Sequence, residues 1–353
     1  MHPENRLTAD VADALRRLDA LPPGARRREA ADALLDRVRG RDVHDELWVR
    51  MHVIDAGHGL PQRVADLEHV TWMLDRVEAA EADDAERLAV LWRAKCALDT
   101  MLATPACGLD AVEQLADRAE RLATAAGLST RSIALVRARC AGERGDAAAA
   151  DLLLAAAAAL PVDALADCPT CEAREVALVR VRSDRGRGVA DLRRAVDAPR
   201  ACHQEPRMSF GLLHALAARG GDEALARWAS RRGRPAVLAW FDRGEDAPAA
   251  AAGHVVGLAL RGRRRAAGRR ALVLAGHPTF SGHDLEAYLL SSAVACALHR
   301  APGSPGARPL PEAVEDLRRT AAARAHALAE AFDARSGTRH RRDELAELLA
   351  PPA

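Results

Sequence analysis

Aromatic side chains and lysine are nearly absent from this chain of 353 residues. Phe, Trp and Tyr make up 3% of it, and Lys95 is the only lysine among 51 basic residues. Strand-forming residues seldom cluster or alternate, whereas the helix formers Ala, Leu, Arg and Glu dominate nearly every stretch. The sequence therefore predicts an all-α protein whose core is built from Ala and Leu.

An excess of charge of one sign is missing as well. The chain carries 51 basic and 50 acidic side chains, so no global field attracts nucleic acid or an anionic membrane. No apolar signal core follows Met1, and the longest apolar run, 152–162, is too short to span a bilayer. Seven cysteines without a secretion signal favour reduced thiols. We therefore expect a cytoplasmic protein with no membrane partner, and the balanced charge argues against nucleic acid as a ligand.

Glycines separate pairs of apolar-periodic stretches, mostly at intervals of 35 to 41 residues. They are Gly24, Gly59, Gly108, Gly145, Gly186, Gly221 and Gly262. An interval of about 34 to 42 residues, filled by two helices and a turn, is typical of an α-solenoid. We expect one continuous right-handed solenoid over residues 1–353, with N-terminal pairs in 1–80, central pairs in 81–300 and C-terminal helices in 301–353.

The periodicity and the turn residues place about eight helix pairs along the chain. The expected helices run over 8–20 and 25–39, 42–56 and 61–78, 83–102 and 109–126, 129–143 and 146–160, 172–183 and 187–196, 206–219 and 222–232, 247–261 and 263–275, and 284–300 and 311–333, with a short helix at 342–350. The stretch 235–248 is expected to be a degenerate repeat.

The cleanest unit is centred on the Gly145–Asp146 turn. Ala150 follows as a small residue inside the second helix, and Pro161 closes the unit. The Gly221–Asp222 turn repeats this pattern with Ala226 in the equivalent place. Both match a degenerate tetratricopeptide pattern, which lacks most of the consensus aromatic residues. We expect Ala150 and Ala226 to be buried where two helices approach.

Three cysteines are spaced for a metal site. Cys168 and Cys171 form a CxxC pair, and Cys202 follows one repeat later with His203 and Glu205 beside it. A two-helix repeat returns the chain to the same edge, so the topology places these thiols about 10 Å apart by backbone. Three thiolates with His203, or alternatively Glu205, as the fourth ligand would form a structural Zn²⁺ site.

The alternative is a stray CxxC and an unrelated cysteine at helix caps, because structural zinc sites more often contain two CxxC pairs. A glutaredoxin-type redox role needs a βαβ context, which an all-α chain lacks. The remaining cysteines lie mostly in helical stretches and are expected to be core residues. They are Cys96, Cys107, Cys140 and Cys296.

A cluster of arginines surrounds the turn at 261–270. It could grip a phosphate, but no aromatic residues alternate with the arginines for base stacking. A solvated helix start is the favoured interpretation.

Several stretches resemble a known family. They are the segments 91–95, 118–121, 126–127, 145–146, 167–172, 202–206 and 331–338, of which Asp-Cys-Pro-Thr-Cys-Glu and Ala-Phe-Asp-Ala-Arg-Ser-Gly-Thr are the most specific. In these the chain resembles an actinobacterial (Streptomyces-type) family of tetratricopeptide-repeat proteins. The resemblance implies the repeat fold and little about activity.

No sequence motif for catalysis appears: there is no Walker lysine, no GxSxG and no GxGxxG before a strand. We therefore expect an interaction scaffold, and not an enzyme, that binds a peptide or partner protein on its concave helical face. The alternative is a zinc-stapled or thiol-based regulatory protein.

Overall fold

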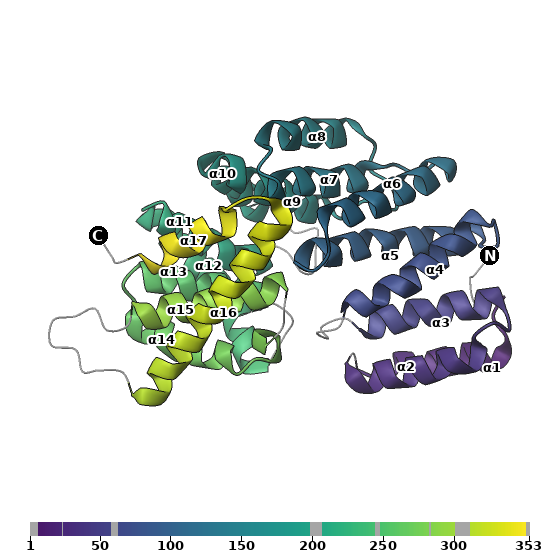
Figure 1. Ribbon diagram of the computed structural model, residues 1–353, viewed down its shortest axis with the longest axis horizontal. Helices are drawn as coiled ribbons and strands as arrows, with labels where there is room; N and C mark the ends of the chain where they lie inside the picture. Colours follow the sequence, from purple (N-terminus) through teal and green to yellow (C-terminus); the bar gives the residue numbers. More distant parts are fainter. Residues whose placement is uncertain are drawn as a thin grey trace. The chain divides into compact units, whose positions relative to one another are not determined.

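The computed structural model describes residues 6–22, 24–57, 63–197, 207–243, 248–281, 284–300 and 311–350. These residues form 17 α-helices and two short 3₁₀ turns, with no strand among them (Figure 1). The prediction of an all-α protein is confirmed. None of the described helices combines the length and the hydropathy that a membrane-spanning segment needs.

The helices follow one another along the chain, with two 3₁₀ turns between them. In chain order they are α1 (Ala9–Asp19), α2 (Ala25–Val38), α3 (Val43–Ala56), α4 (Leu67–Glu78), α5 (Asp84–Ala103), α6 (Leu109–Ala125), α7 (Arg131–Glu143), α8 (Ala147–Ala159), α9 (Pro169–Ser183), α10 (Arg185–Asp197), α11 (Arg207–Arg219), α12 (Glu223–Arg243), α13 (Pro248–Leu260), α14 (Arg264–Ala275), α15 (Leu285–His299), α16 (Glu312–Ser336) and α17 (His340–Leu349). The 3₁₀ turns are η2 (Arg63–Asp66) and η3 (Pro278–Ser281).

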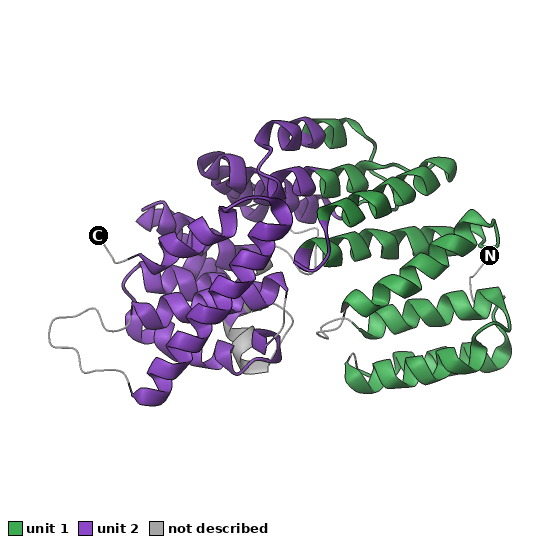
Figure 2. Ribbon diagram, in the orientation of Figure 1, with its two compact units in different colours: residues 1–102, 109–137, 155–166 green, residues 103–108, 138–154, 167–353 purple. Residues whose placement is uncertain are grey.

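The chain divides into two compact units (Figure 2). Unit 1 comprises residues 1–102, 109–137 and 155–166, and unit 2 comprises residues 103–108, 138–154 and 167–353. The single continuous solenoid over residues 1–353 stays a prediction.

Two turns show why the helix pairs form where the sequence predicts them. In the Gly145–Asp146 and Gly221–Asp222 turns the glycine has φ of 76° and 74°, the left-handed region that favours glycine. In both turns the aspartate N–H donates to a carbonyl five residues back at 3.0 Å, and its carboxylate accepts the N–H three residues on at 2.9 Å. Ala150 and Ala226 are 2% and 0% exposed. Both burial predictions are confirmed.

Four helix boundaries differ from the prediction by three residues or more. α4 begins at Leu67, after η2, whereas the predicted helix begins at residue 61, and α16 ends at Ser336, whereas the predicted helix ends at residue 333. The other two are the start of α9 and the end of α12.

α9 begins at Pro169, so Cys171 lies inside the helix and not before it, because Cys168 caps the helix and proline suits its first position. α12 continues through Pro235 to Arg243, whereas the sequence predicted an end at Arg232. Packing on α11 accounts for this second difference. The backbone at Gly233 lies so close to Phe210 that a Cβ atom there would be 2.5 Å from the Phe210 Cβ.

In unit 1 the first three helices share one aliphatic core, which includes Val11, Leu35 and Val53. Further along the unit, α5 carries the only lysine of the chain in a buried position. Lys95 is 5% exposed, its Nζ donates to the Leu165 carbonyl at 3.3 Å, and it lies 3.8 Å from the centre of the Trp92 ring. The amine therefore has both a carbonyl and a π-face to offset its desolvation.

Several polar contacts join residues about 40 positions apart in the chain. In unit 1 they join Thr8–Asp45, Arg28–Asp66, His44–Glu86, Arg93–Asp55 and Arg118–Glu78, at separations of 37, 38, 42, 38 and 40 residues. In unit 2 they join Arg182–Glu143 and Arg261–Glu223, at separations of 39 and 38 residues. All but the last join residues in or beside α-helices that are two helices apart in the chain, whereas Arg261, directly after α13, contacts the first residue of α12. The separations agree with the interval read from the glycines.

In unit 2 alternate helices pack against each other, and glycines let the backbones of α11 and α13 meet. α11 contacts α13, and α13 contacts α15. A Cβ atom on Gly211 would lie 1.9 Å from the carbonyl oxygen of Ala250, so only glycine fits there. A separate aromatic cluster joins α15, α16 and α17, with Tyr288 and Phe332 fully buried at its centre.

Candidate functional site

The CxxC pair predicted to bind zinc lies at the first turn of α9. Cys168 is the N-cap, and its sulfur accepts a hydrogen bond from the N–H of Cys171 at 3.4 Å. Both side chains are half-buried thiols. The other predicted ligands, Cys202, His203 and Glu205, lie outside the described residues. Two thiols at one helix end fit two of the four ligands of a structural zinc ion.

The part of the chain that the structure describes contains no group of three or more His, Cys, Asp or Glu side chains placed to hold a metal ion. The structure therefore brings together Cys168 and Cys171 only. The zinc site stays a prediction.

The cysteines expected in the core are mostly there. Cys107, Cys140 and Cys296 are buried, and Cys96 is half-buried. Burial raises the pKa of Cys107, and it raises the pKa of Cys296 to about 11. These two thiols are therefore protonated at neutral pH and poor nucleophiles.

The segment Phe332–Thr338, one of the most specific parts of the resemblance and without a predicted role, comprises the last turn of α16 and the first residues of its connection to α17. Gly337 ends α16 with φ of 67°. One oxygen of the buried Asp333 accepts the N–H of Arg341 at 2.9 Å, and the other accepts the N–H of Arg342 at 3.0 Å. A residue of α16 thus satisfies two free N–H groups at the start of α17 and fixes the hairpin.

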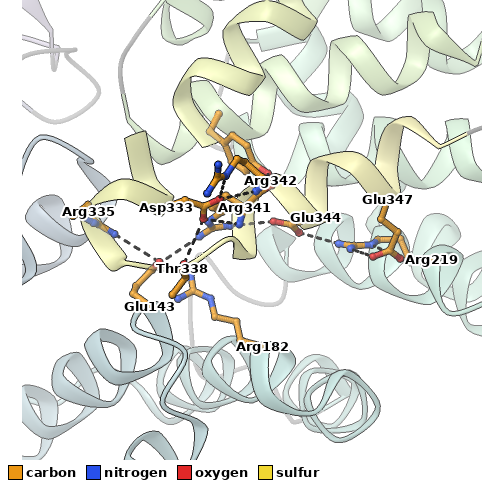
Figure 3. A network of polar contacts seen from close by, with 11 residues as sticks. Glu143, Arg182, Arg219, Asp333, Arg335, Thr338, Arg341, Arg342, Glu344 and Glu347 are labelled. Carbon is orange, nitrogen blue, oxygen red and sulfur yellow. Dashed lines mark hydrogen bonds and ion pairs between the residues drawn. The ribbon is translucent and has the colours of Figure 1, made fainter. Parts of the chain in front are cut away.

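Glu143, the last residue of α7, lies at the centre of a buried ion network in unit 2 (Figure 3). Arg182 of α9 donates to it at 2.5 Å, while Arg341 and Arg335 lie 3.6 and 3.7 Å from its oxygens. Burial alone would raise the pKa of Glu143, but the three guanidinium groups outweigh burial and lower it to about 2. Glu143 is therefore ionised at any physiological pH.

A second group of ion pairs in the network holds α17 nearer its C-terminus. Arg219, at the end of α11, contacts Glu344 at 2.8 Å and also pairs with Glu347. Arg185, the first residue of α10, contacts Glu347 at 2.9 Å. Burial opposes ionisation of Glu347, yet hydrogen bonds from Arg219 and Arg185 lower its pKa to about 2.

Arg341 connects the ion pairs around Glu143 with those around Glu344. Besides Glu143, it contacts Glu344 at 3.2 Å, and its guanidinium carbon lies 5.5 Å from the centre of the Tyr288 ring and 5.7 Å from that of Phe332. One flat cation thus serves two carboxylates and two aromatic faces, a geometry that suits arginine and not lysine.

This network is built to hold helices together and is poorly suited to move protons. General acids and bases work best with a pKa near the operating pH, whereas Glu143 and Glu347 have values of about 2. The residues come from α7, α9, α10, α11, α16 and α17. We name this set the C-terminal clamp, consisting of Glu143, Arg182, Arg185, Arg219, Asp333, Arg335, Arg341, Glu344 and Glu347.

A pair of buried histidines lies elsewhere in unit 2, where α11 meets α13. The rings of His214 and His254 have centroids 5.0 Å apart. His214 faces Arg261 at 3.4 Å, and His254 is hydrogen-bonded to Arg270. Gly257 leaves the His214 ring its space, because a Cβ atom there would lie 2.5 Å from the ring.

Burial is the main reason why both histidines are neutral. It lowers the pKa of His214 to about 4, with Arg261 adding to the effect, while Glu223 opposes it. It also lowers the pKa of His254 to about 3, with His214 and Arg270 adding to the effect. Protonating either ring would place a cation among arginines.

Comparison with known proteins gives no match: no family model, no curated protein and no solved structure matches the chain. The resemblance to actinobacterial tetratricopeptide-repeat proteins therefore stays a prediction, and the functional argument depends on this chain's own residues.

Sequence reasoning missed the clamp, apart from the turn at Phe332–Thr338. Glu143 and Arg182 are separated by 39 residues, and neither stands out among 51 basic and 50 acidic side chains. The one available signal was the predicted repeat interval, because residues about one interval apart are expected to lie beside each other.

Proposed function

We propose that the chain is a right-handed solenoid of degenerate tetratricopeptide-like repeats that acts as a cytoplasmic interaction scaffold for a peptide or partner protein. The observation that carries this proposal is the series of polar contacts at separations of 37 to 42 residues. Contacts repeated at one interval are what a stack of equivalent units produces.

Two further features support a role in recognition. A repeat array contacts mainly its own neighbours and so exposes long helix faces, which is the usual binding surface of such proteins. The charged side chains of the clamp pair with one another between helices, as the lowered pKa values of Glu143 and Glu347 indicate. Groups available for binding are therefore those on exposed helix faces.

The test is capture of partners in the cells that naturally produce the protein. The full chain, carrying an affinity tag, is crosslinked in vivo and recovered under denaturing conditions, and an unrelated helical protein with the same tag is the control. We expect at least one protein that is enriched over the control and that binds the purified chain directly. Absence of any enriched protein, from bait that is folded by circular dichroism, would contradict the scaffold proposal.

A second candidate function rests on the thiol pair at the start of α9. Cys168 already accepts an N–H bond from Cys171, which holds the two residues in one helical turn. With Cys202 and His203 or Glu205, the pair would form a zinc staple between successive repeats, and the protein would be a regulator that responds to zinc or to oxidation. Metal analysis of protein purified without chelators separates this candidate from a simple scaffold.

A further inference from the structure

One face of α14 combines free positive charge with exposed aliphatic side chains. Arg265 and Arg269 are exposed, and Leu272 and Val273 are 47% and 50% exposed. Spacings of three, four and seven residues put these side chains on one side of the helix. The opposite side is fully buried against α13 and α15 (Figure 1); it consists of Ala267, Ala271 and Leu274. We call Arg265, Arg269, Leu272 and Val273 the α14 outer face.

The arginines of this face differ from most others in the protein. Arg182, Arg219 and Arg261 each pair with at least one carboxylate. Among the described residues neither Arg265 nor Arg269 has an ion-pair partner, and α14 itself contains no acidic residue. The α14 outer face therefore keeps its full positive charge.

Neighbouring arginines add to this charge. Burial lowers the pKa of Arg270, and Arg234 of α12 and Arg269 lower it further, which places these cations close together. α14 also begins with Arg264 and Arg265, at the end of a helix where the macrodipole is already positive. A negatively charged group beside this helix would reduce the repulsion among these arginines and interact favourably with the positive end of the helix dipole.

We propose that the α14 outer face docks an acidic amphipathic helix of a partner protein; this inference rests on the scaffold function proposed above. Two carboxylates one helical turn apart would meet Arg265 and Arg269, which have the planar fork that binds carboxylates in pairs. Aliphatic side chains further along the partner helix would cover Leu272 and Val273, so apolar contact and charge act together. The partner's charge is the complement of what the face displays.

A helix is favoured over nucleic acid or a membrane by the face's own chemistry. It has no aromatic side chain on which bases could stack. Its most apolar side is committed to the core, so α14 cannot lay that side into a bilayer. Two exposed aliphatic residues beside two arginines are complementary to one face of an acidic amphipathic helix.

The experiment measures binding of a designed probe to the full chain by fluorescence anisotropy. The probe is a labelled synthetic helix with two leucines in its first half and two glutamates one turn apart in its second half. We expect saturable binding that weakens as salt is raised, since exposed charges are screened. We also expect the R265E/R269E variant to bind at least about tenfold more weakly. The L272S/V273S variant should weaken binding as well, and the same helix with lysine in place of glutamate should not bind.

The matched control is R17E/R26E, which changes net charge equally on exposed arginines of α1 and α2 in unit 1. It should bind the probe as the unaltered chain does. Equal weakening by R17E/R26E, or full binding by L272S/V273S, would show unspecific charge attraction and overturn the proposal. Tighter binding of a DNA duplex or of phosphatidylserine vesicles to the same face would also overturn it.

The in vivo capture distinguishes this inference from the scaffold function. If R265E/R269E, folded by circular dichroism, still recovers every partner, the α14 outer face is not the docking site and the scaffold function stands. If the unaltered chain recovers no partner, the scaffold function itself fails. If the variant loses a partner that R17E/R26E keeps, the docking surface is supported.

Discussion

Acid should destabilise this protein through the buried pair His214 and His254. Both pKa values are lower in the folded protein, at about 4 and about 3, than the value of about 6.5 for a free histidine. The stability that this difference supplies is fully present above the pKa of the unfolded state. It is lost as the pH falls below about 6.5, because the unfolded chain then binds protons that the folded one does not.

The magnitude follows from the pKa difference. Each pH unit below 6.5 costs about 1.4 kcal/mol per histidine until the folded pKa is reached. Between pH 7 and pH 5 each ring therefore removes about 2 kcal/mol, and the pair removes about 4 kcal/mol. Carboxylates contribute little in this window, since their unfolded pKa values of about 4 lie below it.

The assay is urea unfolding followed by circular dichroism at pH 7 and pH 5. The unaltered chain should lose about 4 kcal/mol or more of unfolding free energy between the two. The double variant H214Q/H254Q, which has no group to protonate at either position, should lose about 4 kcal/mol less. Burial also lowers the pKa of His69 and His340, so the variant keeps some pH dependence.

The readout is a difference between two pH values, so a variant that is less stable at both still tests the reasoning. Replacing the exposed His299 by glutamine is the matched control and should leave the pH dependence unchanged. Equal pH dependence in H214Q/H254Q and the unaltered chain would refute the argument.

Three more predictions concern the hairpin, the helix contact and the thiols. Asp333→Ala leaves two N–H groups at the start of α17 without an acceptor, and we expect it to lower the unfolding free energy by about 2 to 4 kcal/mol in urea. Ala150→Phe overfills a buried contact, and we expect a loss of about 1 to 3 kcal/mol by the same measurement. If zinc binds, Cys202→Ser should lower both the zinc content by elemental analysis and the melting temperature.

Each of these has a control at a nearby or chemically similar position. Asp343→Ala changes an exposed carboxylate of α17, Ala155→Phe changes an exposed position of α8, and Cys296→Ser changes a thiol of the core. If Asp333→Ala and Asp343→Ala lower the unfolding free energy equally, the role given to Asp333 in the hairpin is wrong. If Ala150→Phe and Ala155→Phe lower it equally, the close helix contact at Ala150 is wrong. If the Cys202→Ser variant contains as much zinc as the unaltered chain, Cys202 is not a zinc ligand.

Much of the fold could be predicted because its signals are local. The Gly145–Asp146 turn needs only a residue that tolerates positive φ and a side chain that caps the next helix, and both are visible in the sequence. The continuation of α12 through Pro235 could not be predicted. It accompanies close packing of Gly233 on Phe210, and the tertiary contact outweighs a local helix breaker.

The site was harder to predict, for a related reason. Glu143 is one carboxylate among 50 acidic side chains, and nothing beside it in the sequence shows that Arg182 and Arg341 converge on it. Such convergence depends on which helices pack against one another, which is a property of the fold. The thiol pair was visible from the sequence because its two members lie within one helical turn.

The buried position of Lys95 gives the protein a built-in reporter. A protease that cuts only after lysine has a single cleavage site here, and Lys95 is shielded by Trp92 and tied to the Leu165 carbonyl. Cleavage therefore requires α5 to open, and its rate measures that opening in an otherwise unlabelled molecule. On a gel, the conversion of the full-length band into two fragments would then report local opening of unit 1 around α5. A ligand of the protein that slows this cleavage would do so by stabilising the closed form of this region.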